Sequence, residues 1–230
     1  MKLYRYISFE SFVDLIQTSS LCFSYPPIAW DDTFEGFLYR ALKTPQGKQK
    51  ILSLIDSDEQ RLFAETILSD ATLNQSRYLC WTRAKDKVAL WSIYNYMNKA
   101  IMICTTSKKI EELKYENRNV ALMQVNYVSS ISLEDEVKFI QGKTIFTPNI
   151  FRTKRRDFKH ENEVRAHIGT LNKIDPRTPL RVQIPNLLSF LDGVMVHPSA
   201  PSWYVGVVEE YCKINKIKFL GQSKLYKFEV

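Results

Sequence analysis

The chain has 230 residues, of which 45% are hydrophobic and 25% are charged, and this ordinary globular composition excludes a disordered protein. No run of about 18 apolar residues occurs, so we expect no membrane-spanning helix, and the first residues lack the apolar core of a secretory signal, which favours a cytoplasmic protein. The formal net charge of +7 favours an anionic partner such as nucleic acid or a nucleotide.

The N-terminal part predicts a strand, a helix and a second strand. Residues 3–7 read as the first strand, and Ser8 is expected to cap a helix whose apolar residues share one face. Residues 21–24 form a short predicted strand that prolines stop. Residues 41–76 are polar with helical spacing, which predicts a helical insertion within the domain.

The rest of the chain interleaves strands and helices without the regular alternation of a parallel sheet. Strands are predicted over 78–82, 100–105, 120–128, 161–168, 180–184, 193–196 and 224–230, and helices over 88–97, 108–114, 149–156 and from Pro201 onward. In the last helix the predicted buried stripe is Trp203, Val207, Val208, Tyr211 and Ile214. This order predicts one α+β domain over 1–230, with a central mixed or antiparallel sheet flanked by helices.

Several common chemistries lack their sequence signatures. The chain has no glycine-rich phosphate loop and no Gly-x-Ser-x-Gly turn. Its four cysteines are far apart, and none of its three histidines forms a pair at metal-ligand spacing. A structural zinc site is therefore not expected, and the cysteines read as free thiols of a reducing compartment.

The most informative stretch contains Glu161 and Glu163, which follow a basic cluster of Lys154, Arg155 and Arg156. On a strand, side chains two residues apart point to the same face, so the sequence predicts a pair of neighbouring carboxylates. Such a pair can stabilise a developing positive charge or act as a base. The basic cluster is expected to bind the phosphates of a nucleic acid. The alternative is an edge strand with a charged, solvated face.

Motifs along the whole chain resemble a widespread bacterial family of uncharacterised domains. They are Leu3-Tyr4-Arg5-Tyr6, Trp30-Asp31-Asp32-x-Phe34-Glu35, Cys80-Trp81-Thr82, Leu90-Trp91-x-x-Tyr94, Phe158-x-x-Glu161-x-Glu163-Val164-Arg165, His197-Pro198-x-Ala200-Pro201 and Ser223-x-Leu225-Tyr226. The layout is also similar, more distantly, to ADP-ribosyltransferases, above all to the DarT-like toxins that modify nucleic acid.

That second resemblance implies an ADP-ribosyltransferase-like fold and NAD⁺ as cofactor. It implies that Arg5 holds NAD⁺ and that Glu163 supports cleavage of the nicotinamide glycosidic bond. Glu161, close to Glu163 in the chain, is expected to orient the acceptor nucleophile or to act as its base. Further expected NAD⁺ contacts are Ser24, Thr82, Trp91 and Tyr94, with core packing as the alternative for the two aromatic residues. The chain departs from the family where Cys80-Trp81-Thr82 stands in place of Ser-Thr-Ser on the middle strand.

The function expected from this resemblance is a bacterial toxin or phage-defence effector that transfers ADP-ribose to nucleic acid or protein and is neutralised by an antitoxin. Two alternatives stay open at the level of sequence. The first is a metal-dependent nuclease that uses Glu161, Glu163 and the acids of 31–35. The second is a non-catalytic module that binds nucleic acid or a partner through the basic cluster.

Overall fold

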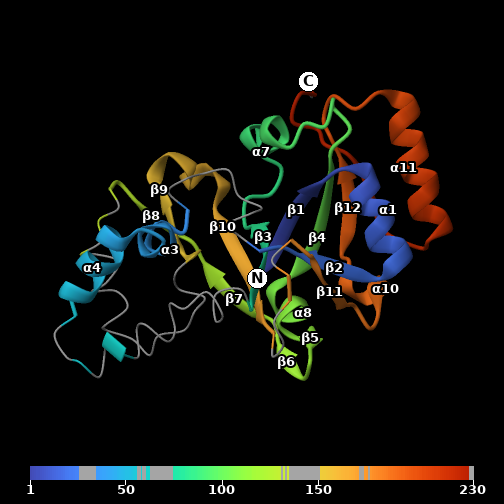
Figure 1. The fold of residues 1–230 in the computed structure, drawn as a ribbon. Helices are drawn as coiled ribbons and strands as arrows, with labels where there is room; N and C mark the ends of the chain where they lie inside the picture. The colour runs from blue at the N-terminus through green and yellow to red at the C-terminus, as the bar shows by residue number, and fades with distance from the viewer. Residues whose placement is uncertain are drawn as a thin grey trace.

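In the computed structural model of the chain, a seven-stranded sheet runs through the centre of the molecule (Figure 1). The structure describes residues 1–25, 35–55, 58, 61–62, 75–130, 132, 134, 151–170, 174–175 and 177–227. In spatial order the strands are β13 (Phe219–Gln222), β12 (Gly193–Val196), β4 (Ile101–Thr106), β1 (Lys2–Ile7), β3 (Ser76–Thr82), β10 (Glu163–Gly169) and β7 (Ala121–Gln124).

Adjacent strands are antiparallel, with one exception at the C-terminal edge. Strands β12 and β13 are parallel, and helix α11 (Ser202–Ile214) connects them. The predicted mixed sheet and the α+β class are therefore confirmed. No helix in the described part of the chain has the length and apolar character needed to cross a bilayer.

Helices α1 (Phe9–Thr18) and α11 lie side by side against one face of the sheet (Figure 1). The Ser8 side chain caps α1 as predicted, accepting a hydrogen bond from the Ser11 amide at 3.2 Å. The two helices meet through aromatic rings, and the centroids of Phe9 and Tyr204 are 5.9 Å apart. Strands β2 (Ser20–Phe23) and β11 (Leu180–Gln183) and helix α10 (Leu187–Phe190) complete this side of the core.

The remaining elements surround the other strands. Helix α7 (Val88–Ile93) follows β3, and α8 (Ser107–Glu111) with the hairpin β5 (Lys114–Tyr115) and β6 (Arg118–Asn119) precedes β7. Helices α3 (Phe37–Leu42) and α4 (Pro45–Ser53), with the paired strands β8 (Asn126–Val128) and β9 (Thr153–Arg155), lie at the end of the molecule opposite α11 (Figure 1). Within the predicted insertion, residues 63–74 lie outside the described residues.

The sheet is split near its middle, between β1 and β3. Strand β1 pairs with β4 along its whole length, from Lys2 to Ile7, but it pairs with β3 only where Tyr4 lies opposite Thr82. Farther along β3, Ser24 takes the place of β1, because its amide and carbonyl bond the backbone of Tyr78 at 2.9 and 2.8 Å. The two halves of the sheet therefore separate beyond Tyr4 and leave an opening between them.

Four predictions of local structure are wrong. Residues 153–155 form strand β9 instead of a helix. The last strand in the described part of the chain is β13, residues 224–227 form a turn where a strand was predicted, and residues 228–230 lie outside the described ranges. The pair of glutamates is not on one strand, because Glu161 ends the 3₁₀ helix η2 (Arg156–Glu161) and β10 starts at Glu163. In α11 the buried residues are Tyr204, Val208 and Cys212, whereas Trp203, Val207 and Ile214 are exposed.

The 3₁₀ helix η2 and the turn after it explain how Glu161 and Glu163 lie close together without sharing a strand. Asn162 adopts a left-handed conformation, with φ 45°, and this reverses the chain between η2 and β10. The reversal brings Glu161 back over the start of β10, where its carbonyl accepts a hydrogen bond from the Thr82 hydroxyl at 2.5 Å. The two carboxylates are therefore neighbours, as predicted, but through a turn instead of through strand alternation.

Candidate active site

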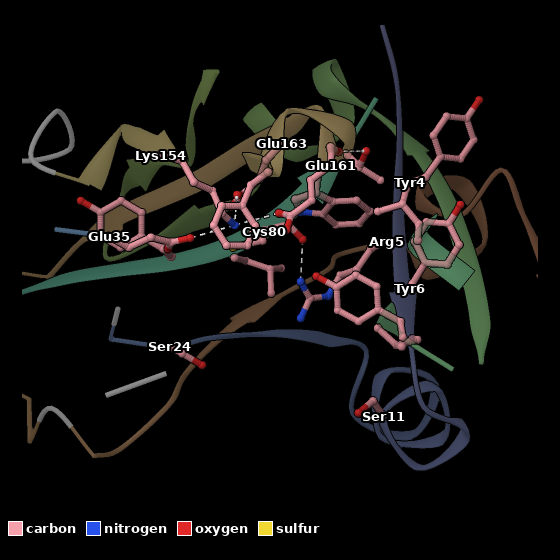
Figure 2. Close-up of a pocket in the computed structure, with 18 of the residues that line it drawn as sticks. Tyr4, Arg5, Tyr6, Ser11, Ser24, Glu35, Cys80, Lys154, Glu161 and Glu163 are labelled. Carbon is pink, nitrogen blue, oxygen red and sulfur yellow. Dashed lines mark hydrogen bonds and ion pairs between the residues drawn. The ribbon is translucent and has the colours of Figure 1, made fainter. Parts of the chain in front are cut away.

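A cavity of about 510 Å³ occupies the split between β1 and β3 (Figure 2). Strand β1 contributes Arg5, and β3 contributes Cys80 and Thr82. The opposite wall carries Glu161 from η2 and Glu163 from β10. Its size is within the range of small-molecule sites, roughly 300–1,000 Å³, so the cavity can take a ligand as large as a nucleotide.

Three carboxylates meet at the ammonium group of Lys154 on one side of this cavity. The Lys154 Nζ atom lies 2.8 Å from Glu35 Oε1, 2.8 Å from Glu161 Oε2 and 3.4 Å from Glu163 Oε2. Figure 2 shows these side chains grouped around Lys154, with Arg5 on the other side of the cavity. Lys154 is therefore buried among acids and is not the exposed phosphate ligand that the sequence predicts.

A second cation, Arg165, binds two of the same three carboxylates. Its side chain is fully buried, and it binds both oxygens of Glu163, with Nε 2.7 Å from Oε1 and Nη2 3.1 Å from Oε2. Nη2 also lies 3.0 Å from Glu35 Oε2, and Nη1 donates to the Phe151 carbonyl. A buried guanidinium with a forked contact of this kind fixes the carboxylate in one orientation.

The two catalytic candidates differ in their electrostatics. Burial raises the pKa of Glu163, but the contacts with Arg165, Lys154 and Cys80 together outweigh burial and lower the pKa to about 2. Burial also raises the pKa of Glu161, and here the Lys154 ammonium offsets the effect only in part, so the pKa of Glu161 stays above its usual value. Glu163 is therefore a permanent anion, and Glu161 is the better proton acceptor.

Two charged side chains of the cavity, Glu161 and Arg5, keep polar atoms that bind no charged partner among the described residues. Lys154 binds Oε2 of Glu161, whereas Oε1 makes no hydrogen bond to any of the described residues. Arg5 donates from Nη1 to the Cys80 carbonyl at 2.5 Å, and it forms no ion pair within the described ranges. The cavity therefore presents an available carboxylate oxygen on one side and a guanidinium without a carboxylate partner on the other.

The structure brings most of the predicted site residues together. Seven of them line the cavity, although Lys154 does so in another role than the predicted one: Arg5, Ser24, Thr82, Tyr94, Lys154, Glu161 and Glu163. Trp91 does not, which corrects the prediction: it is fully buried, its Nε1 donates to Asp86 Oδ1 at 2.7 Å, and its ring packs 4.6 Å from that of Tyr6. Trp91 packs in the core because the buried side of the short helix α7 carries its side chain together with that of Leu90.

The other basic residues of the cluster lie outside the cavity lining. Arg156 is exposed, and the half-buried Arg155 lies over the Phe158 ring, with 5.4 Å from its guanidinium carbon to the ring centroid. Contact between these residues and nucleic acid stays a prediction. The acids at 31 and 32 lie outside the described residues.

Sequence reasoning missed the roles of Arg165 and Cys80. Both follow from period-2 alternation, since Arg165 shares a strand face with Glu163, and Cys80 shares one with Thr82. The register places Arg165 opposite Cys80 and Glu163 opposite Thr82, so one face of two strands forms the floor of the charged cluster. The pairing of these strands is not visible in either segment alone.

His167 is a further buried residue on the face of β10 that carries Glu163 and Arg165, and it should make the free energy of unfolding depend on pH. Burial lowers its pKa from 6.5 to about 4. The unfolded chain therefore takes up a proton below about pH 6.5, before the folded protein does, so stability is complete above that pH and is lost as the pH falls toward 4. We expect the free energy of unfolding to fall by about 3 kcal/mol across this window.

Urea unfolding at a series of pH values checks this expectation. His167→Gln should remove the slope between pH 6.5 and 4, whereas His160→Gln, at an exposed position, should leave it unchanged. Parallel curves for the wild type and His167→Gln would contradict the assignment.

Comparisons with protein-family models, with curated proteins and with solved structures find no match for this chain. The resemblance to ADP-ribosyltransferases therefore stays a prediction. What the cavity can bind follows from its own geometry and charge.

Proposed function

We propose that the protein is an ADP-ribosyltransferase-like enzyme that binds NAD⁺ in the cavity between β1 and β3 and transfers ADP-ribose to nucleic acid or protein. One observation carries the proposal: the same cavity holds the Arg5 guanidinium, which has no carboxylate partner among the described residues, and the open Oε1 atom of Glu161. An ADP-ribosyltransferase-like fold and a toxin or phage-defence role with a neutralising antitoxin belong to the same proposal.

The charge distribution of the cavity matches that of NAD⁺. Three carboxylates and two cations, Lys154 and Arg165, leave one net negative charge in the cluster. A negative wall favours the positively charged nicotinamide ring, and a guanidinium on the other side favours the pyrophosphate. The ligand would therefore bind with its nicotinamide end toward Glu161 and Glu163.

The same orientation supports the chemistry. The bond between ribose C1′ and the nicotinamide nitrogen breaks, and nicotinamide leaves with the electron pair as a neutral molecule. The sugar becomes positively charged, and the permanent anion Glu163 stabilises this charge. A new bond forms from C1′ to the acceptor nucleophile, whose proton goes to Oε1 of Glu161.

Binding of NAD⁺ is the first test. NAD⁺ at about 100 times its dissociation constant should stabilise the protein by roughly 2.7 kcal/mol, which raises the melting temperature by roughly 5–10 °C in a chain of this size. Arg5→Met should lose most of this shift, whereas Lys2→Met, at an exposed position of the same strand, should keep it.

Transfer is the second test. Labelled ADP-ribose from NAD⁺ should appear on RNA, DNA or protein together with free nicotinamide. If NAD⁺ neither stabilises the protein nor releases nicotinamide with any of these acceptors, the proposed function is wrong.

A further inference from the structure

The ammonium group of Lys154 occupies the point at which three carboxylates from separate segments converge. Glu35 precedes α3, Glu161 ends η2, and Glu163 begins β10. The side chains are nearly enclosed, with exposed fractions of 9% for Lys154, 5% for Glu35 and Glu163, and 14% for Glu161. Convergence of carboxylate oxygens on one point is how proteins bind divalent cations such as Mg²⁺, Mn²⁺ and Ca²⁺.

The surroundings hold the lysine firmly at this point. Strand β9 carries Lys154 and pairs with β8, where Tyr127 lies opposite Lys154. The Tyr127 hydroxyl accepts a hydrogen bond from the Glu163 amide at 2.8 Å. This bond links β10 to β8, and β8 in turn pairs with β9, the strand of Lys154. The Phe158 ring covers the ammonium at 4.7 Å from its centroid.

The distances to the carboxylate oxygens, 2.8 to 3.4 Å, are those of charged hydrogen bonds. A metal ion bound to the same oxygens would sit at about 2.0–2.6 Å. Within the described ranges, no group of three or more histidine, cysteine or acidic side chains is arranged to hold a metal ion. Glu35, Glu161 and Glu163 are spaced around a lysine instead.

We infer that Lys154 is the internal counter-ion of this cluster, in the place that a divalent cation takes in a carboxylate site. By binding Oε2 of Glu161 it acts as a positioning residue that leaves Oε1 directed to substrate, a part of the inference that rests on the proposed function. A metal-dependent nuclease would need its metal at the position that Lys154 fills. The native cluster therefore takes no divalent cation, and removal of the ammonium creates a site for one.

Thermal unfolding with and without millimolar MnCl₂ tests this inference without any substrate. Lys154→Ala should melt below the wild type and gain roughly 5 °C or more on addition of Mn²⁺, a gain that EDTA reverses. The wild type and Lys159→Ala, an exposed lysine of η2, should not respond to Mn²⁺ or EDTA. Adding Glu161→Gln to Lys154→Ala should remove the gain, which locates the ion among these carboxylates.

Each other outcome has a defined meaning. Stabilisation of the wild type by Mn²⁺ with reversal by EDTA overturns the inference and favours the nuclease. A folded Lys154→Ala that does not respond to Mn²⁺ also overturns it. If Lys154→Ala folds under neither condition, Lys154→Asn, which keeps all three carboxylates and leaves room for an ion, replaces it, and no Mn²⁺ response there counts against the inference.

These measurements stand apart from the NAD⁺ experiments. A protein that binds no NAD⁺ can still show the Mn²⁺ response of Lys154→Ala, in which case the proposed function fails and the counter-ion role remains. If the protein binds NAD⁺ but Lys154→Ala does not respond to Mn²⁺, the proposed function stands and only the counter-ion role of Lys154 is wrong.

Discussion

Replacing Arg165 with methionine is expected to lower the free energy of unfolding by about 3–5 kcal/mol, the largest loss of stability that we predict for a single substitution. Methionine fills much of the same volume but removes the cation that binds both oxygens of Glu163 and one of the two cations that contact Glu35, and both acids stay buried. Urea unfolding measures the loss. The loss should shrink when Glu163→Gln is added, because the uncompensated carboxylate is then gone.

Arg177 provides the control for this prediction. It also pairs with a carboxylate, at 2.9 Å from Asp175, but its side chain is 81% exposed. Water screens an exposed pair of this kind, so Arg177→Met should be close to the wild type in stability. Similar losses for the two variants would show that burial of Arg165 does not decide its contribution.

Glu161→Gln is expected to reduce the rate of ADP-ribose transfer by about 10²–10⁴-fold, since the amide cannot accept the acceptor proton. Its stability should change by less than about 1 kcal/mol, because Lys154 keeps two carboxylate partners. Glu163→Gln, in contrast, should reduce both transfer and stability, because Arg165 loses the ionised partner that binds it through two atoms. The comparison separates a group that reacts from one that also supports the fold.

Nicotinamide release and urea unfolding, measured on the same preparations, check this pair of variants. Asp157→Asn, at an exposed acid of η2, is the matched control and should behave as the wild type in both measurements. Full transfer activity in Glu161→Gln would remove Glu161 from the proposed mechanism.

The sequence predicts elements well where the signal is local. Strand β1 and helix α1 were expected because alternating and helical spacing of apolar residues, with a capping serine, act over a few neighbouring residues. Helix α11 shows the limit, since apolar residues lie on more than one of its faces. Packing against α1 and the sheet buries Tyr204, Val208 and Cys212. This buried face is rotated by about one residue around the helix from the predicted face.

The candidate site was predictable only in part. The motifs single out Arg5, Glu161 and Glu163, and all three line one cavity. The split that creates this cavity depends on Ser24 pairing with Tyr78, a contact between segments more than 50 residues apart that neither segment signals. The burial of Lys154 was missed because Glu35 comes from a distant part of the chain, and because the turn at Asn162, which brings Glu161 and Glu163 to the same ammonium group, has no clear local signal.

The interrupted pairing between β1 and β3 leaves two inner borders whose main-chain groups face a cavity instead of a neighbouring strand. The Cys80 carbonyl, which accepts the Arg5 guanidinium, is one such group. Main-chain atoms are the same for every amino acid, so recognition through them tolerates drift of the surrounding side chains. A substitution at Cys80 that leaves the main chain in place should therefore preserve the contact that positions Arg5.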